Sequence, residues 1–146
     1  MEGTAHEIKL IDYDEKLPML KEIVKSCGSR SVKDSFSFVG LLKYRKANVN
    51  ILAIENVGFL AFVRCKSHIN IYEFAIAKEE QRKGFGKKLM DSAINYCREN
   101  DIGTVKLRAI KSEPFYNFYL KYGFQIVGEK GNDYLFEMNL NEARLI

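Results

Sequence analysis

The sequence has no tryptophan, two prolines, two histidines and three cysteines among its 146 residues. Cys27, Cys65 and Cys97 are widely spaced and form no C-x-x-C pair, so neither a disulfide framework nor a metal site is expected. No apolar run approaches the roughly 20 residues that cross a bilayer, and no basic-then-apolar signal begins the chain. We therefore expect a cytoplasmic protein that binds neither metal nor membrane.

A large excess of charge of one sign is also absent. The net charge of +4, with 29% charged residues, is too small to predict nucleic-acid binding. Five basic residues nevertheless gather between Lys78 and Lys88, around two glycines, and this placement indicates a compact anion site. The length and the hydrophobic fraction of 47% predict one domain over residues 1–146 with its own core.

Hydrophobic periodicity predicts the element order β-α-α-β-β-β-α-β-α-β-β, which is a mixed sheet with helices on its faces. Short connections between the three strands after residue 48 predict an antiparallel meander. Helices are expected after Asp14 (ending at Cys27–Ser29), within residues 31–45, from Phe85 to a left-handed turn at Gly103, and from Pro114 to Gly123. Strands are expected at Glu7–Ile11, Val49–Ile54, Val57–Cys65, Ile69–Ala77, Val105–Ile110, Phe124–Glu129 and Tyr134–Leu140.

The third strand of the meander changes phase along its length. Ile69 and Ile71 are apolar at odd positions. The apolar residues that follow, Phe74 and Ile76, lie at even positions. A slip of one residue near Glu73 is what a β-bulge produces, and we expect it to splay this strand from a neighbour.

The same strand runs into a basic turn, Gln81–Gly86, that opens an amphipathic helix. The first N–H groups of a helix and its dipole favour an anion, and Gly84 and Gly86 let the backbone turn sharply and approach a phosphate closely. The spacing is neither that of a P-loop nor that of a dinucleotide fold. On spacing alone, a glycine-rich helix entry with solvated lysines remains an alternative to a pyrophosphate site.

Two blocks resemble one family, the GNAT (GCN5-related) N-acetyltransferases. Phe74–Leu89 is similar to its fourth strand, pyrophosphate loop and third helix, with Gln81, Gly84 and Gly86 fitting the loop pattern [QR]-x-x-G-x-[GA]. Phe118–Phe124 resembles its F-Y-x-K-x-G-F segment. The resemblance implies the GNAT fold, an α/β (α+β) class: a mixed, mostly antiparallel sheet of six to seven strands with a β-bulge and splayed central strands, flanked by about four helices.

The resemblance also implies acetyl-CoA as co-substrate. The strand segment Phe74, Ala75 and Ile76 would contact the pantetheine arm, mainly through backbone groups released by the bulge. Gln81 would start the phosphate loop. The pyrophosphate would be held by the backbone of Arg82, Lys83, Gly84, Phe85, Gly86, Lys87 and Lys88.

Tyr119 stands at the position from which the family often protonates the departing thiolate. A phenol with an ordinary pKa near 10 is protonated at neutral pH and suits that role. Tyr119 also belongs to an aromatic stripe with Phe115, Phe118 and Tyr122, so core packing is the alternative. Many members carry asparagine where this chain has Ser112, which leaves a coenzyme contact there open.

An attacking amine must lose a proton, and Glu73 is the candidate general base. It lies in an apolar run beside the inferred bulge, where partial burial would raise its pKa. The alternatives are an exposed carboxylate paired with a basic residue, or water as the base. Cys65 and Cys97 fall in a strand and on an apolar helix face, so no acyl-cysteine is expected.

The expected reaction is therefore direct attack of a primary amine on the thioester in a ternary complex, with a backbone N–H such as that of Ile76 stabilising the oxyanion. A small-molecule or peptide amine is the expected acceptor, and the resemblance is weak over the first 48 residues, which help to shape the acceptor site in this family. A monomer or homodimer is expected. The rival hypothesis is a non-catalytic acyl-CoA-binding or sensing domain.

Overall fold

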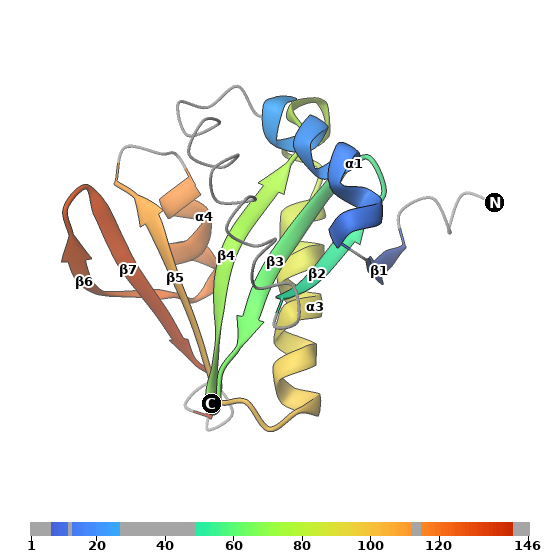
Figure 1. The fold of residues 1–146 in the computed structure, drawn as a ribbon. Coiled ribbons are helices and arrows are strands. Elements are labelled where there is room, and N and C mark those ends of the chain that lie inside the picture. Colours follow the sequence, from blue (N-terminus) through green and yellow to red (C-terminus); the bar gives the residue numbers. More distant parts are fainter. Residues whose placement is uncertain (1–6, 12, 27–48, 112–114, 142–146) are drawn as a thin grey trace.

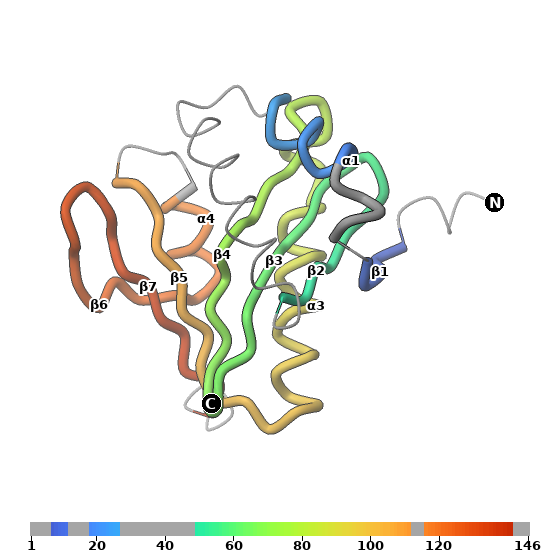
Figure 2. The backbone as a smooth tube through the Cα atoms, viewed as in Figure 1, coloured from blue at the N-terminus to red at the C-terminus, as the bar shows by residue number. Residues whose placement is uncertain are grey.

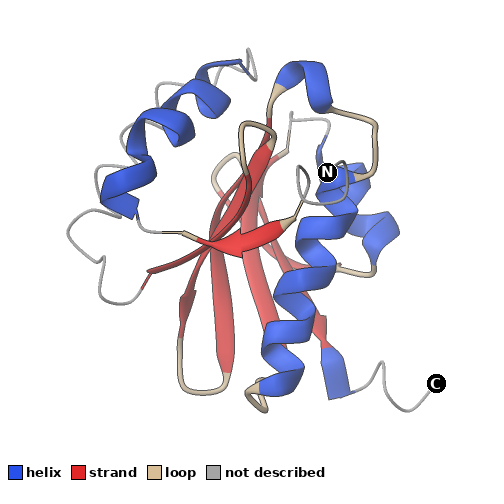
Figure 3. Cartoon of the chain, turned by 90° about the vertical axis from the view of Figure 1, so that its right-hand side faces the viewer, coloured by secondary structure: helices blue, strands red, loops and turns tan. Residues whose placement is uncertain are grey.

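A computed structural model describes residues 7–11, 13–26, 49–111 and 115–141. They form one seven-stranded sheet with helices on both of its faces (Figures 1 and 3). The helices are α1 (Tyr13–Ser26), the short 3-10 helix η3 (Lys78–Glu80), α3 (Phe85–Glu99) and α4 (Phe115–Tyr122). The strands are β1 (Ile8–Leu10), β2 (Val49–Ile54), β3 (Gly58–Arg64), β4 (His68–Ile76), β5 (Thr104–Ile110), β6 (Gln125–Lys130) and β7 (Asp133–Asn139).

The strand order is β1-β2-β3-β4-β5-β7-β6. The strands β1 to β4 pair antiparallel in sequence order, as expected for a meander. The central pair β4 and β5 is parallel, because the connection between them is the helix α3, and β5, β7 and β6 are again antiparallel. The expected mixed, mostly antiparallel sheet is confirmed.

The alternation of side chains along β2 and β3 supplies a core on each face of the sheet. On one face, α1 packs through Leu20, Ile23 and Val24 onto Ile51, Ala53, Phe59, Ala61 and Ala75. On the other, α3 packs through the apolar face that its period predicts, Leu89, Met90, Ala93, Ile94 and Cys97. The helix α4 covers the same face further along the sheet, next to β5 (Figure 1).

The bulge expected near Glu73 is present in β4. Ala61 of β3 pairs with Glu73, whereas the next residue, Phe62, pairs with Ile71, so Tyr72 is the additional residue. The insertion rotates the strand by one position. For this reason Ile71 and Phe74, three residues apart, both belong to the core under α3.

The central strands separate after the bulge. The pairs between β4 and β5 begin at His68↔Thr104 and end at Ile71↔Leu107, one residue before Tyr72. Beyond that point β4 continues to Ile76 along β3, while β5 continues along β7. Figure 2 shows the two strands close together at one end and diverging toward the other. The expected splay is confirmed.

One expected helix end is wrong. We predicted that Gly103 supplies the left-handed turn after the third helix, but the left-handed residue there is Asp101, with φ 56°. Aspartate tolerates this region because its short side chain can bond locally. A Cβ on Gly103 would lie 2.9 Å from the side-chain nitrogen of Asn141, which is the end of a side chain that can move.

Some expectations fall outside the described residues, namely the helix within 31–45, the helix end at Cys27–Ser29 and the turn Ser112–Pro114.

Within the described residues, no helix is long and apolar enough to cross a membrane. In the same part of the chain, no group of three or more histidine, cysteine, aspartate or glutamate side chains is placed to hold a metal ion.

Candidate active site

The expected phosphate loop lies between the end of β4 and the start of α3. Two of its residues have left-handed backbone conformations, Arg82 with φ 65° and Gly84 with φ 88°. Alternation of left- and right-handed residues turns successive N–H groups toward one side, which produces an anion-binding concavity. Gln81 closes the start of the loop, because its Nε2 donates to the backbone oxygen of Ile76 at 3.0 Å. Its role in the structure is thus to fasten the loop to β4.

The N-terminus of α3 is suited to an anion. Its N-cap residue is Gly84, so no side chain caps this end, and the first turn contains no acidic residue. A Cβ built on Gly84 would meet no atom within 4 Å, so the outer side of the turn is open. The helix dipole therefore presents its positive end to the outside of the protein at this turn.

The basic side chains around the loop are exposed, and two of them already have acidic partners. Lys83 Nζ lies 3.2 Å from Glu80 Oε1, and Lys87 Nζ lies 2.9 Å from Asp91 Oδ2. The first pair is three residues apart in sequence and the second, within α3, is four apart, a spacing visible in the sequence. An incoming polyanion would have to compete with these two carboxylates for the lysines.

Gly86 joins the loop to the splayed strand and to α4. A Cβ on this residue would lie 3.4 Å from the ring of Phe74 in β4 and 3.6 Å from the ring of Phe118 in α4. Because glycine has no side chain, the first turn of α3 can rest directly on both rings. The phosphate loop, the splayed strand and α4 therefore meet at Gly86.

Among the residues expected to line the pantetheine arm, Phe74 and Ile76 face the α3 core, whereas Ala75 packs into the core under α1. The Ala75 side chain therefore points away from the side on which Phe74 meets α3 and α4. Any contact from Ala75 to a ligand in the splay has to come from its backbone.

Tyr119 is 7% exposed and lies among aromatic rings. Its ring centroid is 6.3 Å from that of Phe74, 5.8 Å from Phe124 and 5.3 Å from Phe136. The aromatic stripe of α4 is therefore a packed core, and it also places Tyr119 next to the strand that splays. Core packing and a role at the site are both compatible with this position.

The Tyr119 hydroxyl is protonated over the whole physiological range. Burial raises the pKa of Tyr119 well above its ordinary value, and the charge of Glu73 raises it further. Within the described residues, no fully buried side-chain oxygen or nitrogen lacks a hydrogen-bond partner.

Glu73 lies directly after the bulge residue Tyr72 and is half-buried. Its charge raises the pKa of Tyr119, so the carboxylate lies within electrostatic reach of the phenol. Glu73 pairs with Ala61, whose side chain packs into the core under α1, whereas Tyr119 belongs to the core under α3.

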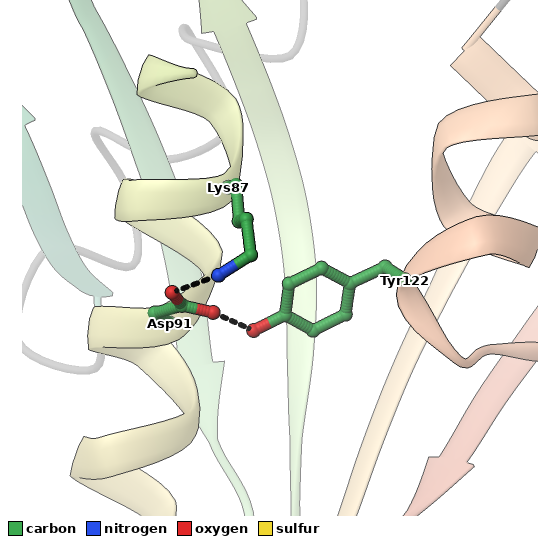
Figure 4. Close-up of polar contacts among 3 residues, drawn as sticks. All are labelled: Lys87, Asp91 and Tyr122. Carbon is green, nitrogen blue, oxygen red and sulfur yellow. Dashed lines mark hydrogen bonds and ion pairs between the residues drawn. The ribbon is translucent and has the colours of Figure 1, made fainter.

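A contact that the sequence did not suggest joins α3 to α4 (Figure 4). The Tyr122 hydroxyl donates to Asp91 Oδ1 at 2.5 Å, and Lys87 Nζ donates to Asp91 Oδ2 at 2.9 Å. Burial alone would raise the pKa of Asp91, but these two bonds outweigh it and lower the pKa below the ordinary value. Burial and the bond to Asp91 raise the pKa of Tyr122. The group is therefore a carboxylate held between a neutral phenol and an ammonium.

The geometry agrees with comparisons to known proteins. A family model described as an acetyltransferase (GNAT) domain matches residues 41–137. The PaiA N-acetyltransferase from Thermoplasma acidophilum, solved in complex with coenzyme A, is similar at 17% identity and a TM-score of 0.76, over 91% of this chain and 98% of that one. A GNAT-family acetyltransferase from Staphylococcus aureus is similar at 18% identity and a TM-score of 0.73, over 92% and 99%.

Ard1 from Thermoplasma volcanium gives a third match, at 19% identity and a TM-score of 0.72, over 93% of this chain and 98% of that one. At these identities the structures establish a shared fold. The family model spans well over half of the chain, and the chain belongs to the GNAT acetyltransferase family. The resemblance seen in the two sequence blocks is confirmed, and the protein is an acetyltransferase.

Proposed function

We propose that the protein transfers an acetyl group from acetyl-CoA to a primary amine by direct attack in a ternary complex. One observation carries the proposal: Phe74 of the splayed strand lies next to both Gly86 of the phosphate loop and Tyr119 of α4. A coenzyme whose pyrophosphate sits on the loop and whose arm enters the splay would bring its thioester to the Tyr119 hydroxyl. The solved neighbour from T. acidophilum, which holds coenzyme A, supports the same use of the fold.

The loop would hold the pyrophosphate through the N–H groups of residues 82–88, with the basic side chains adding charge. The pantetheine arm contains amide groups, and it would lie along the backbone of Phe74, Ala75 and Ile76 as a short strand-like segment. We expect Lys83 and Lys87 to turn from their carboxylate partners to the phosphates. No metal is needed for these contacts.

The reaction requires two proton transfers. The amine loses its proton to Glu73, directly or through water, and its lone pair forms the C–N bond at the thioester carbon. The tetrahedral intermediate then collapses, the C–S bond breaks, and the sulfur leaves as a thiolate. A backbone N–H of β4 would stabilise the oxyanion, and the Tyr119 hydroxyl would donate to the departing sulfur.

The charge of Glu73 acts on Tyr119 and in this way links the two transfers. A phenol with a raised pKa is a weaker acid than a thiol of ordinary pKa about 8.5, so Tyr119 begins as a hydrogen-bond donor to the sulfur. When Glu73 takes up the proton of the amine, it loses the charge that helps to raise the pKa of Tyr119. Proton transfer from Tyr119 to the thiolate then becomes easier at the moment when it is required.

No covalent acyl-enzyme is part of the proposal. Cys97 is fully buried in the core, and burial raises the pKa of its thiol to about 11, so it is a neutral packing residue. We further propose that the acceptor is a small-molecule or peptide amine, and that the protein acts as a monomer or homodimer.

Release of free thiol from acetyl-CoA, measured with a broad panel of amines, tests the proposal. Tyr119→Phe removes only the hydroxyl and should lower kcat by about 100-fold, the lower end of the range of general acid catalysis, with little change in the affinity for acetyl-CoA. Tyr96→Phe is the matched control, because Tyr96 packs against Phe62 from α3, away from the splay.

Wild-type turnover by Tyr119→Phe would return Tyr119 to a packing role. Binding of acetyl-CoA without thiol release for any amine would favour the rival function, a non-catalytic acyl-CoA-binding domain. If thermal unfolding shows no stabilisation by acetyl-CoA, the assignment of the loop is wrong.

A further inference from the structure

The hydrogen bond between Tyr122 and Asp91 connects the two helices that the proposed reaction has to hold in register. The N-terminus of α3 carries the phosphate loop, and α4 carries Tyr119 three residues before Tyr122. Because the covalent chain of the coenzyme limits the distance between pyrophosphate and sulfur, the offset between these helices influences whether the Tyr119 hydroxyl meets the sulfur. A contact that fixes the offset between α3 and α4 would therefore affect the rate of acetyl transfer.

We propose that Asp91 and Tyr122 are positioning residues, which lock α4 to α3 so that Tyr119 faces the thioester of a coenzyme bound on the loop. This inference rests on the proposed function. The family pattern matched by Phe118–Phe124 leaves the position of Tyr122 unspecified.

The two helices contact each other at two levels. The first is apolar, where Gly86 rests on the ring of Phe118. The second is polar, where Tyr122 reaches Asp91. Gly86 and Asp91 are five residues apart, which is about 7.5 Å along a helix at ~1.5 Å per residue. A single contact would let α4 pivot on α3, whereas two contacts at this separation fix its orientation.

The polar contact is well defined for its position near the surface. The Tyr122 ring is held by Phe118 and Phe124, with centroids at 5.9 and 6.2 Å, so the hydroxyl has little freedom before it reaches Asp91. This side-chain hydrogen bond joins α4 to α3. Hydrogen bonds to a charged group are shorter and stronger than those between neutral groups.

Coenzyme binding is expected to leave the bond between Asp91 and Tyr122 in place, because the two oxygens of Asp91 have different partners. Oδ1 accepts from Tyr122 and Oδ2 accepts from Lys87 (Figure 4). If Lys87 turns to a phosphate, Oδ2 is released but the bond to Tyr122 remains. Asp91 therefore holds α4 in place and, in the same structure, competes with the coenzyme for Lys87.

The test measures kcat and the KM for acetyl-CoA of the whole protein, using the amine of the panel that gives the highest wild-type turnover. Tyr122→Phe keeps the ring and removes the hydroxyl, and it should lower kcat about tenfold, since a misplacement of ~1 Å can cost about a hundredfold. Its KM for acetyl-CoA should stay within about twofold of the wild-type value, because the loop is unchanged. Tyr96→Phe on α3 is the matched control and should retain wild-type kcat.

Asp91→Asn is the second variant and gives a different signature. It should lower kcat less than Tyr122→Phe does, because the amide oxygen of asparagine can still accept the Tyr122 hydroxyl in a weaker, uncharged bond. It should also lower the KM for acetyl-CoA, because it removes a negative charge and the competitor for Lys87. General damage to the fold would raise KM instead.

A second set of variants shows whether the effect passes through Tyr119. In a Tyr119→Phe background there is no hydroxyl to position, so adding Tyr122→Phe should change kcat by less than about twofold, the non-additivity expected for coupled residues. Melting temperatures of all variants, measured with and without acetyl-CoA, establish that each variant is folded and binds acetyl-CoA.

Three results would overturn the inference. If Tyr122→Phe matches Tyr96→Phe while the wild type is active, the inference fails and the proposed function stands. If Tyr122→Phe costs the same in both backgrounds, the bond is structural and does not act through Tyr119. If the wild-type protein releases no thiol with any amine, the proposed function and the inference fail together.

Discussion

Gly58, the first residue of β3, offers a direct test of how β3 fits against the end of β4. It pairs with Ile76, and a Cβ built on it would lie 2.6 Å from Ile76 Cδ1 and 2.8 Å from the backbone oxygen of Ala75. The first atom is the end of a flexible side chain and can move. The second belongs to the backbone of the strand that we propose lines the pantetheine arm, so Gly58→Ala has to push that strand away.

The size of the effect follows from two opposing contributions. Inserting an atom into a filled site costs about 1–3 kcal/mol, while replacing glycine by alanine inside a strand recovers about 0.5–1 kcal/mol. The net destabilisation is about 1–2 kcal/mol. For a domain of this size the melting temperature falls by about 2–4 °C per kcal/mol, which gives a drop of about 2–8 °C.

Thermal unfolding followed by circular dichroism measures this change. Gly128→Ala is the matched control, because its Cβ would meet only the side chain of Leu135, at 3.3 Å. The displaced strand should also reduce the stabilisation that acetyl-CoA gives to Gly58→Ala. Gly58→Ala could instead have the same melting temperature as the Gly128→Ala control and keep the full stabilisation by acetyl-CoA. That result would show that the described packing of Gly58 on β4 is wrong.

Three further changes test the loop and the contact between the helices. Gly86→Val should abolish the thermal stabilisation by acetyl-CoA because its methyl groups collide with Phe74 and Phe118, whereas Gly86→Ala, at ordinary contact distance, should keep most of it. Arg82→Gly removes a left-handed arginine that costs about 1–2 kcal/mol, against about 0.5–1 kcal/mol for the added flexibility, so urea unfolding should show equal or slightly higher stability. The pKa of Asp91 is lower in the folded protein, so its contribution to stability is present above the ordinary pKa of 3.8 and is lost as the pH falls through the folded value. Asp91→Asn should therefore flatten the decline in unfolding free energy between about pH 5 and pH 3, and an unchanged slope would contradict the contact.

The elements that the sequence predicted well are those with a clear period. The strand at Val49–Ile54 has the expected bounds, and the bulge near Glu73 was visible because a strand with a period of two shows any insertion as a change of phase. The loop at Gln81–Gly86 was recognisable because its glycines and basic residues are adjacent in sequence. Local signals of this kind require no knowledge of how distant segments pack.

The features that the sequence did not predict depend on the arrangement of distant segments. Asp91 and Tyr122 are 31 residues apart, and Tyr122 belongs to an apolar stripe in which its hydroxyl carries no signal. The placement of β7 between β5 and β6 was not predictable either, because a hairpin can join a sheet by either strand. The helix end assigned to Gly103 failed because both an aspartate and a glycine follow α3, and Asp101 takes the left-handed conformation.

The parallel pairing of β4 with β5 has a consequence for how the protein opens. The antiparallel groups β1–β4 and β5–β7 are joined within the sheet only along residues 68–71 and 104–107, of the strands that the structure describes. With so short a seam, we expect the two groups of strands to open separately in hydrogen exchange before the whole domain unfolds. A molecule lying along both strands beyond the seam would extend it, and amides on both sides would then exchange as one unit.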